Sequence, residues 1–130
     1  VMKVLILICM IFCHIVDDYY LQGWLASAKQ KQWWEKNAPE DLYKNDYKVA
    51  LLMHSFSWSF MTMTPSVVYK FITGGTNISM IIALFIANVL IHSIVDNLKA
   101  NRKLINLIID QSVHLIQIVY TWFFIVVINY

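Results

Sequence analysis

The chain has 130 residues, of which 59% are hydrophobic and only 14% charged, and its formal net charge at pH 7 is +2. A soluble domain this small has too much surface for its volume to bury so many apolar side chains. The composition therefore excludes an ordinary soluble domain and predicts a single transmembrane domain over residues 1–130. The lysines flank apolar segments and form no basic face, so nucleic acid is not an expected partner.

Four apolar runs follow one another along the chain. Each is long enough to cross a hydrocarbon layer of about 30 Å, which takes about 20 helical residues. The later connections, such as the uncharged turn at residues 73–77, are short and favour antiparallel neighbours. We therefore expect an all-α integral membrane protein, an up-down-up-down four-helix bundle. The predicted spans are residues 4–22, 49–72, 77–98 and 103–128.

The polar stretch 23–48, between the first two spans, mixes tryptophans with lysines. Trp33 and Trp34 lie between Lys29 and Lys36. This mixture is typical of a helix that lies in the headgroup layer, with its aromatic side toward the acyl chains and its basic side toward water. We therefore expect an interfacial amphipathic helix in this segment, and the lipid bilayer as its partner.

Positive charge is distributed unequally between the two ends of the predicted spans. Eight lysine and arginine residues fall on the side of the segment 23–48 and of the basic turn 98–103, whereas Lys3 and Lys70 fall on the other side. Cytoplasmic loops of membrane proteins carry an excess of these residues. We therefore predict that the segment 23–48 lies in the cytoplasm and that both termini lie outside. A homo-oligomer is left open.

All four histidines of the chain are predicted to lie at one depth, near the cytoplasmic ends of four different spans. Three of them have an aspartate four residues away, so that each pair shares one helical face. Such polar faces turn away from lipid. Imidazoles and carboxylates that are crowded together repel one another or lack hydrogen-bond partners unless an ion binds them. Both groups are ligands of divalent metals. The predicted metal ligands are His14, Asp18, His54, His92, Asp96, Asp110 and His114.

Each of these residues also has a purely structural interpretation, because a single polar residue near a helix end can reach the headgroups or cap a neighbour. The same spacing in three spans favours a metal site instead. Seven candidates exceed one tetrahedral shell. We leave open whether one metal is held by histidines that the aspartates orient, or whether two metals share carboxylates. Zinc is the expected ion, with manganese, iron or nickel as alternatives.

Four blocks of residues occur in order along the chain: HIVDDYYLQGW from His14, LMH ending at His54, HSIVDNLK from His92, and DQSVH from Asp110. They resemble a family of small bacterial and phage membrane proteins of unknown function, related to predicted membrane-bound metal-dependent hydrolases. The resemblance implies a bacterial inner membrane location and a bacterial or phage origin. The positions that it implies as functional are His14, Asp18, Gln22, His54, His92, Asp96, Lys99, Asp110, Gln111 and His114.

We expect a metal-dependent hydrolase that acts on a phosphate- or acyl-containing substrate at the cytoplasmic membrane face. A bound metal lowers the pKa of a water molecule and polarises such a group. Asp18 or Asp96 is the expected catalytic base. Lys99 and Arg102 would hold a phosphate, and an amide side chain would donate to a developing oxyanion. The predicted substrate-binding residues are Gln22, Lys99, Arg102 and Gln111.

Two other functions use the same residues. Intramembrane acids and histidines also form the relays of cation or proton transporters and channels, but the polar stripe of this chain is predicted to end near the middle of the membrane. A metal can instead serve as a structural clasp in a membrane adaptor or a holin-like protein. The presence of Gln22 and Lys99 beside the predicted ligands favours a catalytic metal site over a structural one.

Overall fold

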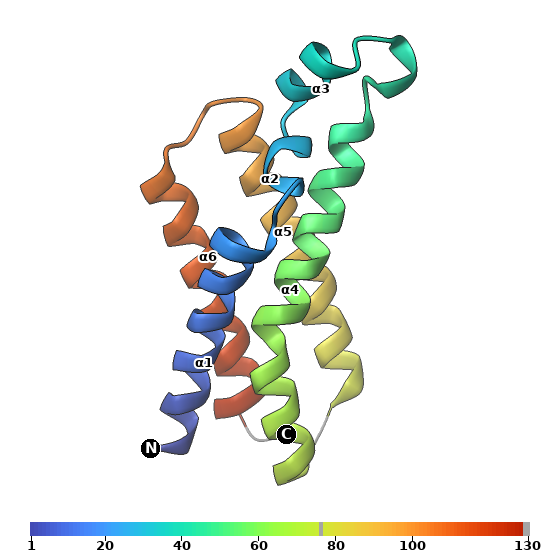
Figure 1. Ribbon diagram of the computed structural model, residues 1–130. Coiled ribbons are helices and arrows are strands. Elements are labelled where there is room, and N and C mark those ends of the chain that lie inside the picture. The colour runs from blue at the N-terminus through green and yellow to red at the C-terminus, as the bar shows by residue number, and fades with distance from the viewer. Residues whose placement is uncertain (76, 129–130) are drawn as a thin grey trace.

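The computed structural model describes residues 1–75 and 77–128, and within them the chain is helical, without a strand. Four long helices run side by side, each antiparallel to the preceding one (Figure 1). They are α1 (Met2–Val16), α4 (Asp46–Thr73), α5 (Ile78–Ala100) and α6 (Leu107–Trp122). The two most extensive contacts between these helices are those of α4 with α5 and with α1. The prediction of an all-α protein is confirmed.

Wider π-helical turns continue two of the long helices, η1 (Asp17–Leu21) after α1 and η3 (Phe123–Val127) after α6. Consecutive residues of an α-helix point about 100° apart, and a π-helical turn inserts an extra residue that changes this direction locally. In η1 both aspartates, Asp17 and Asp18, are buried as a result. The π-helical turn therefore gives the interior two carboxylates at this level of the helix.

The polar stretch between α1 and α4 differs from the single amphipathic helix that we predicted. It forms α2 (Leu25–Ala28), α3 (Lys31–Asn37) and a 3-10 turn, η2 (Asp41–Tyr43), at the end of the molecule away from the N-terminus (Figure 1). The side chain of Asn101, in the turn after α5, binds the backbone at the break between α2 and α3. It donates to the carbonyl oxygen of Lys29 at 3.0 Å and accepts from the backbone N–H of Lys31 at 2.6 Å.

The last long helix begins at Leu107, four residues later than the predicted start of the fourth span at residue 103. Two local features set this boundary. Lys103 has a φ of 55°, which is incompatible with helix. The Asn106 side chain accepts a hydrogen bond from the backbone N–H of Ile109 at 3.0 Å, which is the usual cap of a helix N-terminus.

Polar side chains fill the interior of the protein, and apolar side chains cover its outside. Among the described residues, sixteen polar or charged residues are buried, against eleven hydrophobic ones. Large apolar side chains face outward instead, with Phe12 64% exposed and Ile116 66% exposed. In water this arrangement would be unfavourable, whereas in lipid apolar side chains must face outward and polar ones inward.

Three helical stretches are long and apolar enough to cross a membrane, which is typical of a membrane protein: Met2–Leu21, Ile78–Ala100 and Leu107–Val127. The helix α4, which contains the predicted span 49–72, is not among the helices that qualify in the described part of the chain. Its 28 residues are long enough. Its serines and threonines, together with His54 and Pro65, lower its hydropathy, and its crossing of a membrane stays a prediction.

Candidate metal centre

The four histidines come from the four long helices and meet in the interior. His14 lies on α1, His54 on α4, His92 on α5 and His114 on α6, and all four are buried. The rings of His92 and His114 stack with their centroids 4.1 Å apart, and those of His54 and His92 are 5.1 Å apart. Together with the buried Asp17, Asp18, Asp96 and Asp110, these histidines form what we call the His/Asp cluster.

Asp96 is the carboxylate that connects the histidines. Its Oδ2 lies 3.4 Å from His54 Nε2. Its Oδ1 lies 3.3 Å from His114 Nε2 and 3.8 Å from His92 Nε2. Asp18 approaches from the opposite side, with Oδ1 3.3 Å from His54 Nε2. The Nε2 atoms of three histidines therefore face two carboxylates.

Two overlapping groups in the cluster have the spacing of metal ligands. One consists of Asp18, His54 and His92, and the other of His92, Asp96 and His114, with the donor atoms of each group within 4.8 Å of one another. Donors around a tetrahedral ion at about 2.0–2.1 Å lie about 3.4 Å apart. His54 Nε2 is 3.2 Å from His92 Nε2 and 3.3 Å from Asp18 Oδ1. These separations fit a shell of metal ligands.

His14 belongs to neither group, although its Nδ1 lies 3.3 Å from Asp18 Oδ2, and both of its ring nitrogens also have partners outside the two groups. Its Nδ1 accepts a hydrogen bond from the indole N–H of Trp58 at 2.8 Å, and its Nε2 lies 3.1 Å from Gln111 Oε1, to which it can donate. Trp58 in turn stacks on His92, with ring centroids 4.3 Å apart. His14 is thus placed to orient Trp58, and Trp58 supports a ring of the cluster.

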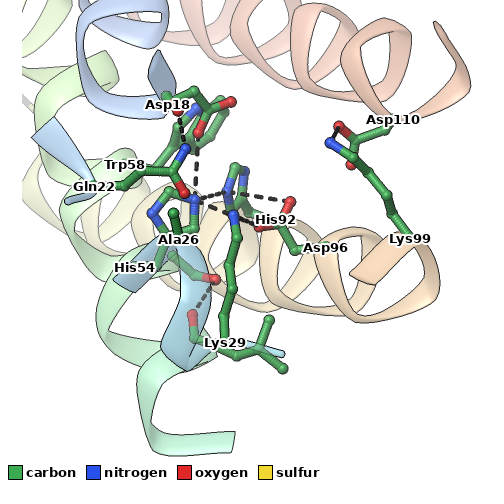
Figure 2. Close-up of polar contacts among 12 residues, drawn as sticks. Asp18, Gln22, Ala26, Lys29, His54, Trp58, His92, Asp96, Lys99 and Asp110 are labelled. Atoms are coloured by element: carbon green, nitrogen blue, oxygen red, sulfur yellow. Dashed lines mark hydrogen bonds and ion pairs between the residues drawn. The ribbon is translucent and has the colours of Figure 1, made fainter. Parts of the chain in front are cut away.

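Asp110 is engaged with polar partners at the edge of the cluster, and Figure 2 shows its pair with Lys99 to one side of the central residues. Its Oδ2 accepts from Lys99 Nζ at 2.6 Å and from Gln111 Nε2 at 3.0 Å. Its Oδ1 lies 3.5 Å from His114 Nε2. Two of the predicted substrate-binding residues, Lys99 and Gln111, therefore contact a carboxylate of the cluster.

The other two predicted substrate-binding residues lie elsewhere. The side-chain amide of Gln22 donates to the backbone carbonyl oxygen of Asp18, four residues earlier on the same helix. Arg102 is exposed in the turn after α5 and is outside both groups of ligands. The structure therefore brings Gln22 to the edge of the cluster and leaves Arg102 on the surface.

Lys29 is a member of the site that sequence reasoning missed. Its side chain extends from the end of α2 into the cluster (Figure 2), where Nζ lies 2.6 Å from Asp96 Oδ2. The side chain is only 14% exposed. Lys29 lies in the segment predicted as an interfacial helix, and local spacing does not reveal its partner, because the two residues are 67 positions apart.

Asp17 is a second such residue, because it is not among the predicted metal ligands. Its Oδ1 accepts a hydrogen bond from Ser57 Oγ at 2.7 Å, and its Oδ2 lies 3.8 Å from His54 Nδ1. The latter distance is longer than a hydrogen bond, but the carboxylate lies on the side of the His54 ring where carboxylates commonly orient a metal-binding histidine. The sequence feature that relates to Asp17 is its partner Ser57, which lies three residues after His54 and therefore on the same side of α4.

The charges of the cluster fit a divalent cation. Four buried aspartates face the ammonium groups of Lys29 and Lys99, which leaves a formal charge of −2 when the imidazoles are neutral. Buried charges without partners are unfavourable by several kcal/mol each, in order of magnitude. Protonation of two imidazoles would balance the same charge. Among the described residues, the fully buried carboxylate oxygens without a hydrogen-bond partner are Asp17 Oδ2, Asp18 Oδ1 and Asp110 Oδ1.

Comparison with known proteins identifies the family of the chain but gives it no activity. No curated protein and no solved structure matches it. A family match does extend over residues 6–130 and includes every residue of the His/Asp cluster. The chain therefore belongs to the family described as "Protein of unknown function (DUF3307)".

Proposed function

We propose that this protein is a multi-pass inner-membrane protein whose His/Asp cluster binds one or two divalent metal ions, preferably zinc, and hydrolyses a phosphate- or acyl-containing substrate at the cytoplasmic membrane face. The observation that carries the proposal is the pair of buried ligand groups that share His92. Zinc prefers imidazole and carboxylate donors at these separations. The −2 charge of the cluster supports the same ion.

The membrane part of the proposal is a four-helix bundle in which α4 crosses with the other three long helices. The residues that lower the hydropathy of α4 are mostly inside, since Ser55, Ser59 and Thr62 are buried. The lipid would contact its apolar face, where Phe56 and Phe60 are exposed.

Lys29 follows α2, and Lys31 and Lys36 belong to α3. Both helices lie at the end of the molecule away from the N-terminus (Figure 1), and this excess of lysine supports a cytoplasmic location for that end.

The ligands of the proposed metal would be His54, His92 and His114, with Asp18 and Asp96. A bound divalent ion would act as a Lewis acid that polarises a phosphoryl or acyl group. All of these side chains are fixed by packing in the helices, so little rearrangement is needed to hold the ion.

The remaining polar groups would bind the substrate and move its protons. If Asp18 binds the ion through Oδ1, its other carboxylate oxygen, Oδ2, would be the general base that accepts a proton. Lys29 and Lys99 carry ammonium groups at the edge of the cluster and can bind an anionic group. The substrate would approach the cluster from the side of Lys29, whose side chain reaches in from the end of α2.

Hydrolysis can be tested with two chromogenic esters, p-nitrophenyl phosphate and p-nitrophenyl acetate, on protein in detergent that has been depleted of metal and reloaded with zinc. We expect zinc-dependent hydrolysis of at least one ester, which His92→Ala and Asp18→Asn abolish. Asp46→Asn, at the start of α4 and outside the cluster, is the matched control. Zinc binding without hydrolysis of either ester would contradict the proposed hydrolase activity but not the proposed metal site.

A second function, transport of a cation or proton, is favoured by a hydrogen-bonded chain that leads away from the cluster. His114 Nδ1 lies 3.1 Å from Gln117 Oε1, Gln117 Nε2 donates to Asn88 Oδ1 at 3.2 Å, and Asn88 Nδ2 donates to Thr121 Oγ1 at 2.8 Å. An apolar cluster that contains Met63 lies beyond this chain. Zinc or proton uptake into proteoliposomes, lost in Asn88→Leu, would favour transport over hydrolysis.

A further inference from the structure

A groove of about 530 Å³ lies on the outside of the protein between α4 and α5. It is located where α4 begins and α5 ends, at the end of the molecule that carries α2 and α3 (Figure 1). Tyr47, Lys48 and Arg102 line its polar end, and Leu51 and Ile94 line its apolar part. None of the residues that line the groove belongs to the His/Asp cluster.

The groove has two cations and no acid in its lining. In the described part of the chain neither Lys48 nor Arg102 forms an ion pair, whereas Lys29 and Lys99 are both bound to aspartates. Lys48 is exposed, and its Nζ lies 5.9 Å from the centre of the Tyr47 ring, within the range of a cation–π contact. Two uncompensated cations beside one groove favour the binding of an anion.

The polarity of the groove changes along the helix axes. Leu51 follows Lys48 by one helical turn on α4, and Leu98 and Ile94 precede Arg102 by one and two turns on α5. The cations are therefore at the ends of the helices, and the apolar residues are deeper in the proposed membrane. This order is the order of phosphate and acyl chain in a phospholipid.

We propose that this groove binds an anionic glycerophospholipid, with its phosphate between Lys48 and Arg102 and an acyl chain against Leu51, Ile94 and Leu98. Basic pockets between membrane helices on the cytoplasmic side bind anionic lipid headgroups in this way. The proposal depends on membrane insertion of the helices, with the lysine-rich end in the cytoplasm. It does not depend on the metal.

The test is native mass spectrometry of the full chain in detergent with added phosphatidylglycerol or phosphatidylcholine of identical acyl chains. We expect one retained phosphatidylglycerol per chain and at least about tenfold weaker binding of phosphatidylcholine. The Lys48→Gln/Arg102→Gln double variant should lose phosphatidylglycerol by at least about tenfold, since each basic residue near an anionic lipid strengthens binding several-fold.

The matched control is Lys36→Gln/Lys103→Gln, which removes two charges from the same end of the molecule outside the groove. Unchanged lipid binding in the groove variant, an equal loss in the control, or equal binding of both lipids would overturn the proposal. Displacement of phosphatidylglycerol by inorganic phosphate at equal concentration would also overturn it, because the acyl contacts would then contribute nothing. The zinc content of the groove variant should be unchanged, which separates this test from the metal proposal.

Discussion

Replacement of Lys29 by methionine removes a cation from the proposed metal site and retains an unbranched side chain of similar length. The ammonium lies 2.6 Å from Asp96 Oδ2, and the side chain is buried enough that water screens it little. An incoming metal ion must compete with this cation for the negative charge of Asp96. We therefore expect Lys29→Met to bind zinc more tightly than the unmodified protein.

The size of the effect follows from the contact. Hydrogen bonds between charged groups are worth about 1.5–3 kcal/mol, and the ammonium also repels a divalent ion a few ångströms away. A gain of at least about 1.5 kcal/mol in the free energy of zinc binding corresponds to at least about tenfold tighter binding. Without metal, the variant should unfold at a lower temperature, because Asp96 loses a partner in the interior.

The assay is a competition titration against a chromogenic zinc chelator in detergent. Lys31→Met is the control, since that lysine pairs with Glu35 on the surface at 3.3 Å and its side chain is 53% exposed. We expect the control to change zinc affinity by less than about twofold, as exposed ion pairs contribute little. Equal or weaker zinc binding in Lys29→Met would show that Lys29 does not compete with the metal ion for Asp96.

Three further substitutions test other parts of the site. Asp96→Asn should weaken zinc binding by at least about 100-fold in the same titration, because even residues behind the ligands contribute 10- to 100-fold. Trp58→Phe should lower the free energy of unfolding by about 1–3 kcal/mol, since a smaller aromatic ring replaces the indole and His14 Nδ1 loses its donor; thermal unfolding in detergent measures this. Asn101→Ala should speed tryptic cleavage after Lys29 with little change in the temperature of global unfolding, because it frees the backbone between α2 and α3. Unchanged cleavage would show that Asn101 does not hold that segment.

The sequence predicted features that depend on local spacing. An interval of four residues places His92 and Asp96 on one face of a helix, and lipid outside a helix turns that face inward. The structure places this face in the interior together with the corresponding faces of α1 and α6. Helix formation and burial of polar faces are local consequences of composition and period, so one sequence was enough to expect them.

Contacts between distant segments could not be predicted in this way. Lys29 meets Asp96 and Asn101 only because α2 folds back over the end of α5, and nothing in the local pattern of either segment specifies that position. The π-helical turn that buries Asp17 beside Asp18 also departs from the regular period on which our reasoning depended. Such departures are frequent at functional sites.

The metal content of the protein tests most directly whether the His/Asp cluster binds metal. After equilibrium dialysis against buffered zinc, elemental analysis should find one or two zinc ions per chain in the unmodified protein. His92→Ala should retain at least one ion fewer, because His92 belongs to both groups of ligands. A content near zero in the unmodified protein, or an unchanged content in His92→Ala, would contradict the central claim that the His/Asp cluster is a metal site.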